Sequence, residues 1–367
     1  MKTIVFFIPN IEKGGIEKNL VILSNFFVKN NYVVEIYYAE ISKEILIQLD
    51  NKIILRKSNK FLELFFIKKR ILNTINCSLN LMINLKKIDQ SIILSMQDHP
   101  VPIIIGKLKK IKCIIRIANH PFSSLRFFNN KFKFYIKIII KLFFYRFSDG
   151  VVCNSNSSKI FLNKFINSKI ISIYNPLIFN KKIGLIKRTN NHNYLLVVGR
   201  IEKQKNFYGI IQAYNIVKIK HPSIKLIIFG SGSEKNRLLK LVSDLKIEEN
   251  VIFKGYKNPT NFYLKSKIFI LNSYFEGMPN VILEAFYYKI PVISSNCLSG
   301  PNEILCNNKF GYLVPVNDYK YLAKKINYVL ENYNKARKKT ILAYRSLDRF
   351  NHLKQCEKYK SFINYFF

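Results

Sequence analysis

Residues 275–285 read Phe-Glu-Gly-Met-Pro-Asn-Val-Ile-Leu-Glu-Ala, and this stretch decides the fold. It follows the apolar run Ile268–Leu271, which is typical of a buried parallel strand. Gly277 and Pro279 predict a tight loop, and Asn280 is expected to cap the helix that begins there. The backbone amides of Met278–Val281 would then lie at the positive end of a helix, which suits a phosphate.

Two glutamates in this stretch are its chemically active groups. Glu284 is expected in the first helical turn, facing a ligand if Val281 and Ala285 pack inward, where its carboxylate accepts hydrogen bonds from ribose hydroxyls. Glu276 lies in the loop, eight positions earlier, and can reach a sugar ring. The two carboxylates would serve opposite ends of one sugar nucleotide, together with the loop residues Gly277, Met278, Pro279, Asn280 and Val281.

Three other turns also join an apolar run to a helix-length segment. Gly14-Gly15 allows close approach of a ligand to the backbone, although a Gly-Gly pair by itself is more often an ordinary turn. In Gly199–Asn206, Arg200 and Lys205 offer a guanidinium and an ammonium that suit a diphosphate, the alternative being a solvated basic loop. Gly230, in the turn after Phe229, fits either a ligand or a simple turn.

Short apolar runs alternate with helix-length segments along the whole chain, which predicts doubly wound parallel sheets. The expected strands are Ile4–Ile8, Val33–Tyr38, Ile92–Ser95, Cys113–Ile117 and Gly150–Asn154, then Tyr194–Val198, Lys225–Phe229, Val251–Lys254, Ile268–Leu271 and Val292–Ser294. The expected helices are Glu17–Lys29, Lys131–Arg146, Asn206–Lys220, Lys235–Leu245, Asn280–Tyr288 and Tyr319–Glu331.

The chain length and a break near Asn175-Pro176 predict two domains, residues 1–178 and 179–349, joined by the polar stretch Lys181–Asn193. Two similar α/β halves imply a cleft between them. The C-terminal stretch Leu347–Phe367 has helical spacing, and the helix at 350–367 is expected to pack back on the first domain. Its predicted buried face consists of Phe350, Leu353, Tyr359, Phe362 and Ile363.

The net charge of +38 invites a nucleic-acid interpretation. The excess is spread evenly, with 28 basic and 10 acidic residues in 1–178 and 32 and 12 in the remainder. A biased codon usage accounts for much of it, as the abundance of Ile, Asn, Phe and Tyr indicates. If the charge has an anionic partner, a membrane surface or a phosphorylated substrate suits it better than a DNA groove.

The six cysteines form no C-x-x-C pair, so free thiols in a reducing cytosol are expected. The N-terminal apolar run Ile4–Ile8 is shorter than the core of a signal peptide, and no apolar run is long enough to predict a transmembrane helix. The nearest case, Phe132–Phe147, is interrupted by Lys133, Lys137 and Lys141. It is either a buried helix or a segment that rests on an anionic membrane interface.

Residues 194–300 resemble the C-terminal half of the group 1 glycosyl transferases, the family 4 retaining glycosyltransferases, and the resemblance is most specific from Gly199 to Glu284. That family carries a G-R-x-x-x-x-K-N loop, an F/G-x-G turn and two glutamates eight apart in an F-E-G-x-P setting, and this sequence has each in order. Gly14-Gly15-Ile16-Glu17 is similar to the family's N-terminal glycine loop. The resemblance implies the GT-B fold, with two Rossmann-like domains facing across a cleft.

The resemblance also implies roles for residues of this chain. Arg200 and Lys205 would hold the donor diphosphate, Glu284 the ribose, and Glu276 the transferred sugar. Gly15 would approach the donor from the first domain, and the segment around Tyr256 would frame the nucleobase. The family often has a histidine near the transferred sugar, and His120 is preferred here over His99; both stand in His-Pro turns after predicted strands.

The implied reaction moves a sugar, with retention, from a nucleoside-diphosphate sugar such as a UDP-sugar to a glycan or lipid-linked acceptor. The setting would be bacterial capsule, O-antigen or lipopolysaccharide synthesis, in the cytoplasm or on the inner face of its membrane. No D-x-D pair is present to hold a divalent ion, so metal-independent chemistry without a cofactor is expected. The alternatives are another GT-B enzyme, such as a sugar-nucleotide epimerase or a phosphorylase, or a basic nucleic-acid-binding protein.

Overall fold

The computed structural model describes residues 1–11, 15–59, 69–86, 90–123, 130–179 and 193–367. The chain divides into two compact units. The first unit comprises Met1–Leu177 and Phe350–Phe367, and the second comprises Ile178–Arg349. Apart from Asn193, the predicted linker Lys181–Asn193 lies outside the described residues.

The first unit contains a seven-stranded parallel sheet in the order β5-β3-β1-β6-β7-β8-β9. Chain order reverses between β1 and β6, which is the position where open α/β sheets bind ligands. A two-stranded sheet of β2 and β4 accompanies it. The strands are β1 (Thr3–Phe7), β2 (Asn10–Ile11), β3 (Val33–Tyr38), β4 (Glu40–Ile41), β5 (Ile54–Lys57), β6 (Ser91–Ser95), β7 (Lys112–Ile117), β8 (Gly150–Cys153) and β9 (Lys169–Ser172).

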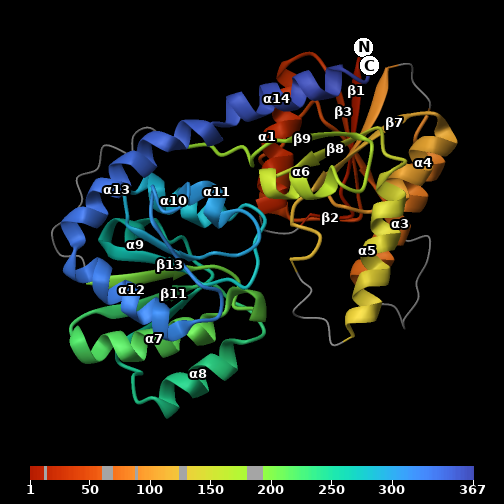
Figure 1. The fold of residues 1–367 in the computed structure, drawn as a ribbon. Helices are drawn as coiled ribbons and strands as arrows, with labels where there is room; N and C mark the ends of the chain where they lie inside the picture. The colour runs from red at the N-terminus through yellow and green to blue at the C-terminus, as the bar shows by residue number, and fades with distance from the viewer. Residues whose placement is uncertain (12–14, 60–68, 87–89, 124–129, 180–192) are drawn as a thin grey trace. The chain divides into compact units, whose positions relative to one another are not determined.

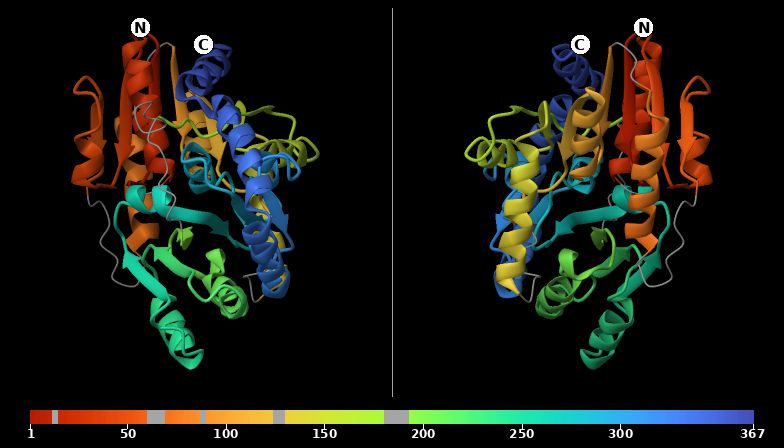
Figure 2. Two further views of the ribbon diagram at one scale, coloured as in Figure 1. Left: turned by 90° about the vertical axis from the view of Figure 1, so that its left-hand side faces the viewer. Right: turned by 90° about the vertical axis from the view of Figure 1, so that its right-hand side faces the viewer.

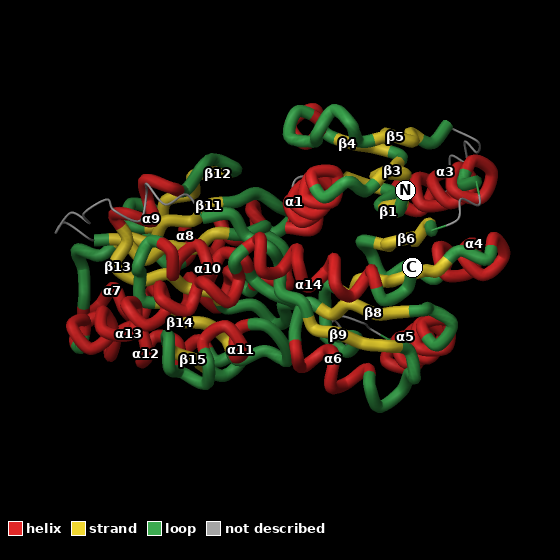
Figure 3. Tube along the Cα trace, turned by 90° about the horizontal axis from the view of Figure 1, so that it is seen from above, coloured by secondary structure: helices red, strands yellow, loops and turns green. Residues whose placement is uncertain are grey.

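Both faces of this sheet are buried, which is why its central strands are continuously apolar. Along β1, Ile4 and Phe6 join the core beneath α1 and α14, whereas Val5 and Phe7 join the core beneath α3, α4 and α5. Figure 3 shows the two groups of helices on opposite sides of the strands. The helices are α1 (Gly15–Lys29), α2 (Lys43–Leu46), α3 (Lys69–Asn84), α4 (Val101–Lys109), α5 (Lys131–Tyr145), α6 (Asn156–Leu162) and α14 (His352–Asn364).

The C-terminal helix α14 packs on the first unit, where it lies beside α1 (Figure 1). Asn351 caps it by accepting hydrogen bonds from the amides of residues 353 and 354. Tyr359, Phe362 and Ile363 are buried in the core that α1 also covers. Leu353 was predicted on the same face but is 56% exposed. The prediction was wrong because Leu353 lies in the first turn, and the buried face of this helix begins at Gln355 and Cys356.

The second unit contains a six-stranded parallel sheet in the order β12-β11-β10-β13-β14-β15, which reverses between β10 and β13. One core lies between this sheet and α7, α8 and α12. On the other face, Tyr263 of α9 stacks on Phe269 of β13. The strands are β10 (Tyr194–Val198), β11 (Lys225–Phe229), β12 (Val251–Gly255), β13 (Ser266–Leu271), β14 (Val292–Ser295) and β15 (Tyr312–Val314).

The helices of the second unit alternate with its strands, as a doubly wound sheet requires. They are η3 (Lys203–Lys205), α7 (Phe207–Lys220), α8 (Lys235–Asp244), α9 (Thr260–Lys265), α10 (Asn280–Tyr287), α11 (Pro301–Leu305), α12 (Tyr319–Glu331) and α13 (Tyr333–Arg345), followed by η4 (Ser346–Phe350). The predicted fold class, α/β with doubly wound parallel sheets, is therefore confirmed.

The segment Phe132–Phe147 forms most of α5, and the structure excludes one of its two interpretations. Within α5 only Phe134, Ile138 and Tyr145 are buried, so it is not a buried helix. Across the described residues, no helix is both long and apolar enough to cross a membrane.

The packing of α14 makes a prediction about stability. Ile363→Ala removes a fully buried side chain from this core and should lower the free energy of unfolding by about 2–5 kcal/mol. Leu353→Ala, on the exposed face of the same helix, should change it by less than about 0.5 kcal/mol. Urea denaturation followed by circular dichroism measures both. Equal effects would show that α14 is not anchored as described.

Candidate functional site

The loop after β13 places the Glu276 carboxylate in a buried ion pair. The Lys205 ammonium lies 2.6 Å from Glu276 Oε1, and the Ser273 hydroxyl donates to the same oxygen at 2.5 Å. The two charged side chains are 15% and 8% exposed. Lys205 follows β10 and Glu276 follows β13, so the pair joins the two loops at the reversal point of the sheet.

Buried serines hold the backbone of this loop. Ser299 donates to the Glu276 carbonyl oxygen at 2.6 Å, and Ser295 donates to the Ser273 carbonyl oxygen at 2.6 Å. Gly300 has a φ of 84°, and a Cβ there would lie 2.1 Å from the Gly277 carbonyl oxygen. Only glycine fits that position, so the loop after β14 closely buttresses the Glu276 loop.

The Lys205 loop is also bonded to the Glu276 loop through its backbone. Gln204 donates from Nε2 to the Phe275 carbonyl oxygen at 2.9 Å, and the Tyr274 amide donates to the Gln204 carbonyl oxygen at 2.8 Å. Asn206 takes a left-handed conformation and caps α7 by accepting from the Gly209 amide. The helix therefore begins one residue after the predicted start, and Lys205 lies in the short η3 turn before it.

Gly230 brings a third loop to this edge. Its φ is 141°, and a Cβ would lie 1.8 Å from the Gly199 carbonyl oxygen, so a side chain is excluded. The Gly230 amide donates to the Gly255 carbonyl oxygen, which connects the loop to the end of β12. Arg200, next to Gly199, is exposed, and Tyr256, next to Gly255, is 66% exposed.

Glu284 lies on α10 and has a different partner. The buried Tyr263 donates its hydroxyl proton to Glu284 Oε2 at 2.9 Å. Burial, and then the neighbouring Glu284 carboxylate, raise the pKa of Tyr263 well above its usual value. Tyr263 stacks on Tyr288 with ring centroids 4.9 Å apart. The tyrosine therefore fixes the orientation of this carboxylate.

Three details of the predicted α10 site were wrong. Asn280 does not cap the helix: it is the first helical residue, and Pro279 occupies the cap position without a side-chain hydrogen bond to the helix. Glu284 is the fifth residue of α10, just beyond the first turn. Val281 does not pack inward; it is half-buried like Glu284 and lies three positions before it, on the same face. The loop residues Gly277, Met278 and Pro279 are buried.

In the first unit, the predicted residues follow three neighbouring strands. Gly15 begins α1 after β1, His99 follows β6 and His120 follows β7, so all three lie at the carboxyl edge of the sheet. His99 is next to the reversal point, and His120 is one strand further on. Gly14 lies outside the described residues.

Both histidines are partly buried, and burial lowers the pKa of each below its ordinary value. His120 accepts a hydrogen bond at Nδ1 from the Phe122 amide, and its ring lies 4.8 Å from that of Phe161. A neutral imidazole is therefore favoured at both positions at neutral pH.

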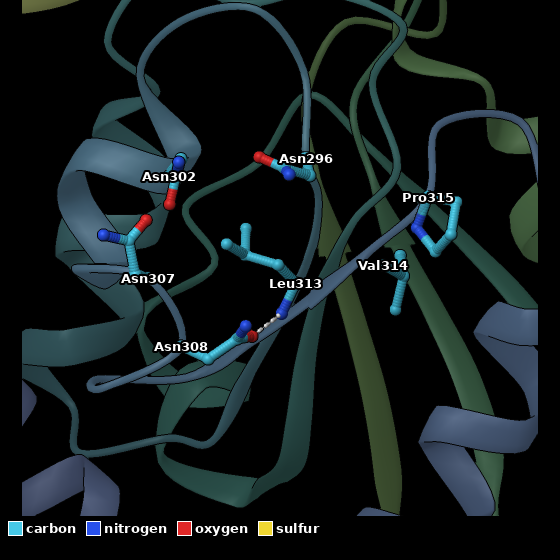
Figure 4. A pocket seen from close by; sticks show the side chains of 7 residues that line it. All are labelled: Asn296, Asn302, Asn307, Asn308, Leu313, Val314 and Pro315. Atoms are coloured by element: carbon cyan, nitrogen blue, oxygen red, sulfur yellow. Dashed lines mark hydrogen bonds between the residues drawn. The ribbon is translucent and has the colours of Figure 1, made fainter.

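A cavity of about 420 Å³ lies elsewhere in the second unit, at the ends of β14 and β15 (Figure 4). It is lined by Asn296, Asn302, Asn307, Asn308, Leu313, Val314 and Pro315, none of which is a predicted site residue. Since it holds no charged group, it does not match a diphosphate. In the part of the chain that the structure describes, no three His, Cys, Asp or Glu residues gather as they would around a metal ion.

Comparison with known proteins identifies the second unit. Residues 181–345 match the family model described as glycosyl transferases group 1. The second unit is therefore similar to the group 1 glycosyl transferases. An uncharacterized glycosyltransferase of Methanocaldococcus jannaschii is 32% identical over 223 residues, which are 56% of this chain and 54% of that protein.

Two further similar proteins match nearly the whole length of this chain. One is the Campylobacter jejuni GalNAc-alpha-(1->4)-GalNAc-alpha-(1->3)-diNAcBac-PP-undecaprenol alpha-1,4-N-acetyl-D-galactosaminyltransferase, 25% identical over 91% of this chain and 90% of that protein. The other is the solved structure of Anabaena HepE in complex with UDP-glucose, with a TM-score of 0.79 at 16% identity, covering 99% of this chain and 100% of that one. The fold is GT-B, as predicted.

Sequence reasoning found Lys205, Glu276 and Glu284 but missed the neutral groups that hold them. Ser273 had a readable signal, because it stands three residues before Glu276 in a short loop. Tyr263 and Ser299 had none, since each reaches its partner from another segment of the chain.

The buried ion pair is expected to show strong coupling. Lys205→Met leaves the Glu276 carboxylate buried without its cation and should cost about 3–5 kcal/mol of unfolding free energy. The double variant Lys205→Met/Glu276→Gln should be more stable than the sum of the two single effects predicts. The exposed pair Lys220–Glu331, at a similar distance, is the control and should show little coupling in urea denaturation. Additive effects at Lys205 and Glu276 would contradict the described pair.

Proposed function

We propose that this glycosyltransferase transfers a sugar from a nucleoside-diphosphate sugar, with UDP as the nucleotide, to a glycan or lipid-linked acceptor. The Lys205–Glu276 pair at the reversal point of the second sheet carries this proposal. It puts a cation for the diphosphate and a carboxylate for the sugar within one contact of each other. The UDP-glucose bound to the structural relative HepE supports the choice of nucleotide.

Arg200 and Lys205 hold the diphosphate in this proposal, and Glu284 binds the ribose. As the sugar bond breaks, negative charge builds up on the departing diphosphate, and the two cations stabilise it. Lys205 can contact the diphosphate and stay close to Glu276, because the two side chains are already in contact. A divalent ion is then unnecessary, and transfer should survive excess EDTA with less than about a twofold change in rate.

The acceptor proposal follows from the relatives. The Campylobacter jejuni relative has an undecaprenol-diphosphate-linked glycan in its name, and another relative is an amylovoran biosynthesis glycosyltransferase of Erwinia amylovora. We infer a role in bacterial surface polysaccharide synthesis at the cytoplasmic side of the membrane, with retention of the anomeric configuration. Proton NMR of the product before mutarotation determines the configuration, and an inverted product would overturn that part.

Donor binding can be measured without knowing the acceptor. In a thermal-shift screen of nucleotide sugars, the true donor at 100 times its Kd should stabilise the protein by about 2.7 kcal/mol. Arg200→Ala removes a charged hydrogen-bond donor and should raise the Kd of that nucleotide sugar about 10- to 100-fold. Arg237→Ala, an exposed arginine on α8, is the matched control and should have no effect. If no nucleotide sugar binds, or if the two variants behave alike, the donor assignment is wrong.

The histidine proposed to face the sugar is His120, and a comparison with His99 tests it. His120→Asn should lower kcat more than about 100-fold if its imidazole touches the reacting sugar. His99→Asn should have a much smaller effect. Steady-state kinetics with the identified donor measures both, and circular dichroism checks that both variants fold. The reverse order would assign the role to His99.

A further inference from the structure

The outward face of α5 is apolar, contrary to what a solvated helix requires. Six large apolar side chains recur at helical spacing on this face and are 41–72% exposed. They are Phe132, Ile136, Ile139, Ile140, Phe143 and, just after the helix, Phe147. A helix on the surface of a globular protein normally presents polar residues to solvent there.

The opposite face of the same helix is also apolar and faces the core. Phe134, Ile138 and Tyr145 are buried, and Tyr145 joins the core beneath the sheet. At 100° per residue these three lie on one side of the helix, and the exposed set is centred about 180° away. The helix therefore has two apolar faces, and only one of them is used by the fold. Figure 2 (right) shows α5 at the periphery of the first unit, toward the viewer.

Lysines line one boundary between the two faces. Lys133, Lys137 and Lys141 are spaced four apart and form a stripe along the helix, which contains no Asp or Glu. Lys141 forms an ion pair with Asp98, and Tyr145 donates its hydroxyl proton to the same carboxylate at 3.1 Å. These contacts fix how the helix is rotated and keep the outer apolar face turned away from the sheet.

We propose that this outer face of α5 docks on an anionic lipid bilayer surface. The aromatic and aliphatic side chains would enter the interface, with the exposed Lys133 and Lys137 beside the headgroups. A contiguous exposed apolar area of this kind marks an interaction site. The positive charge favours an anionic surface as the partner. A second copy of this chain would bring another net charge of +38 and would be repelled, whereas an anionic surface attracts the protein.

The position of α5 connects this surface to the candidate site. Asp98, which holds Lys141 and Tyr145, is next to His99 at the carboxyl edge of the first sheet. A bilayer beneath α5 would bring a lipid-linked acceptor toward that edge. The docking itself stands on the helix alone and does not depend on the proposed transfer reaction.

The absence of tryptophan from the sequence gives a clean probe. Phe143→Trp introduces the sole indole, on the outer face of α5, and Leu353→Trp puts it on the exposed side of α14 as a control. With phosphatidylglycerol vesicles, the emission of Phe143→Trp should shift to the blue and be quenched by brominated acyl chains. Leu353→Trp should do neither. Equal behaviour of the two variants would overturn the proposal.

Vesicle sedimentation separates insertion from simple charge attraction. Replacing Ile136, Ile139, Ile140 and Phe143 by Ser keeps the net charge and should weaken binding to phosphatidylglycerol vesicles at 0.5 M salt by more than about tenfold. The matched control replaces four exposed residues on other helices by Ser, namely Ile219, Leu239, Ile341 and Leu353. This variant should bind like the unmodified protein.

Two other outcomes would overturn the proposal. Equal salt-dependent loss in both fourfold variants would mean attraction by charge alone. Dimers in lipid-free sedimentation velocity that disappear in the α5 variant would assign the face to a second copy. None of these measurements uses glycosyl transfer, so a failure of the proposed reaction would not be mistaken for a failure of docking.

Discussion

All strands within each main sheet run parallel, and this constraint governs the rest of the molecule. Parallel strands need helical crossovers, so each sheet is covered on both faces and its central strands must be apolar throughout. The loops that leave the carboxyl ends all meet at one edge. Where the strand order reverses, neighbouring loops diverge to opposite faces and leave room for a ligand. In the second unit, the loops that carry Lys205 and Glu276 meet at that point.

The free-energy cost of burying a charge explains why the contact between the Lys205 and Glu276 loops contains so many hydrogen bonds. A carboxylate removed from water needs a cation and further donors, or it becomes protonated. Glu276 has Lys205 and Ser273, and its backbone is held by Ser299. A network of this kind keeps a buried group charged and fixed in position without the help of water. A site that stabilises charge during a reaction needs such preorganised groups. Glu284, bonded to the buried Tyr263, follows the same principle with a neutral donor.

The sequence was sufficient for whatever depends on local pattern. The apolar runs located the ends of the central strands to within two residues, the largest difference being at the start of β13, and the glycine-containing turns located the loops between them. Short edge strands such as β5 and β15 were missed, because exposed or three-residue strands have no apolar periodicity to detect. The roles of Val281 and Asn280 were misjudged for a related reason: the exact start of a helix depends on the loop before it, here on Pro279. Contacts between distant segments, such as Tyr263 with Glu284, have no sequence signature.

For Phe132–Phe147, hydrophobic periodicity does not distinguish the two interpretations, and the exposure of its side chains in the structure does. A helix that is apolar on both sides has no single hydrophobic direction, so periodicity cannot tell which side packs on the sheet. The Asp98 contacts with Lys141 and Tyr145 resolve the question, since they turn Phe134 and Ile138 inward. The apolar side chains left outside then require a partner other than water. Because the charge of the chain is spread over both halves, electrostatics would draw the protein to any anionic surface. In the proposed docking, the apolar face of α5 would then determine which part of the protein makes contact.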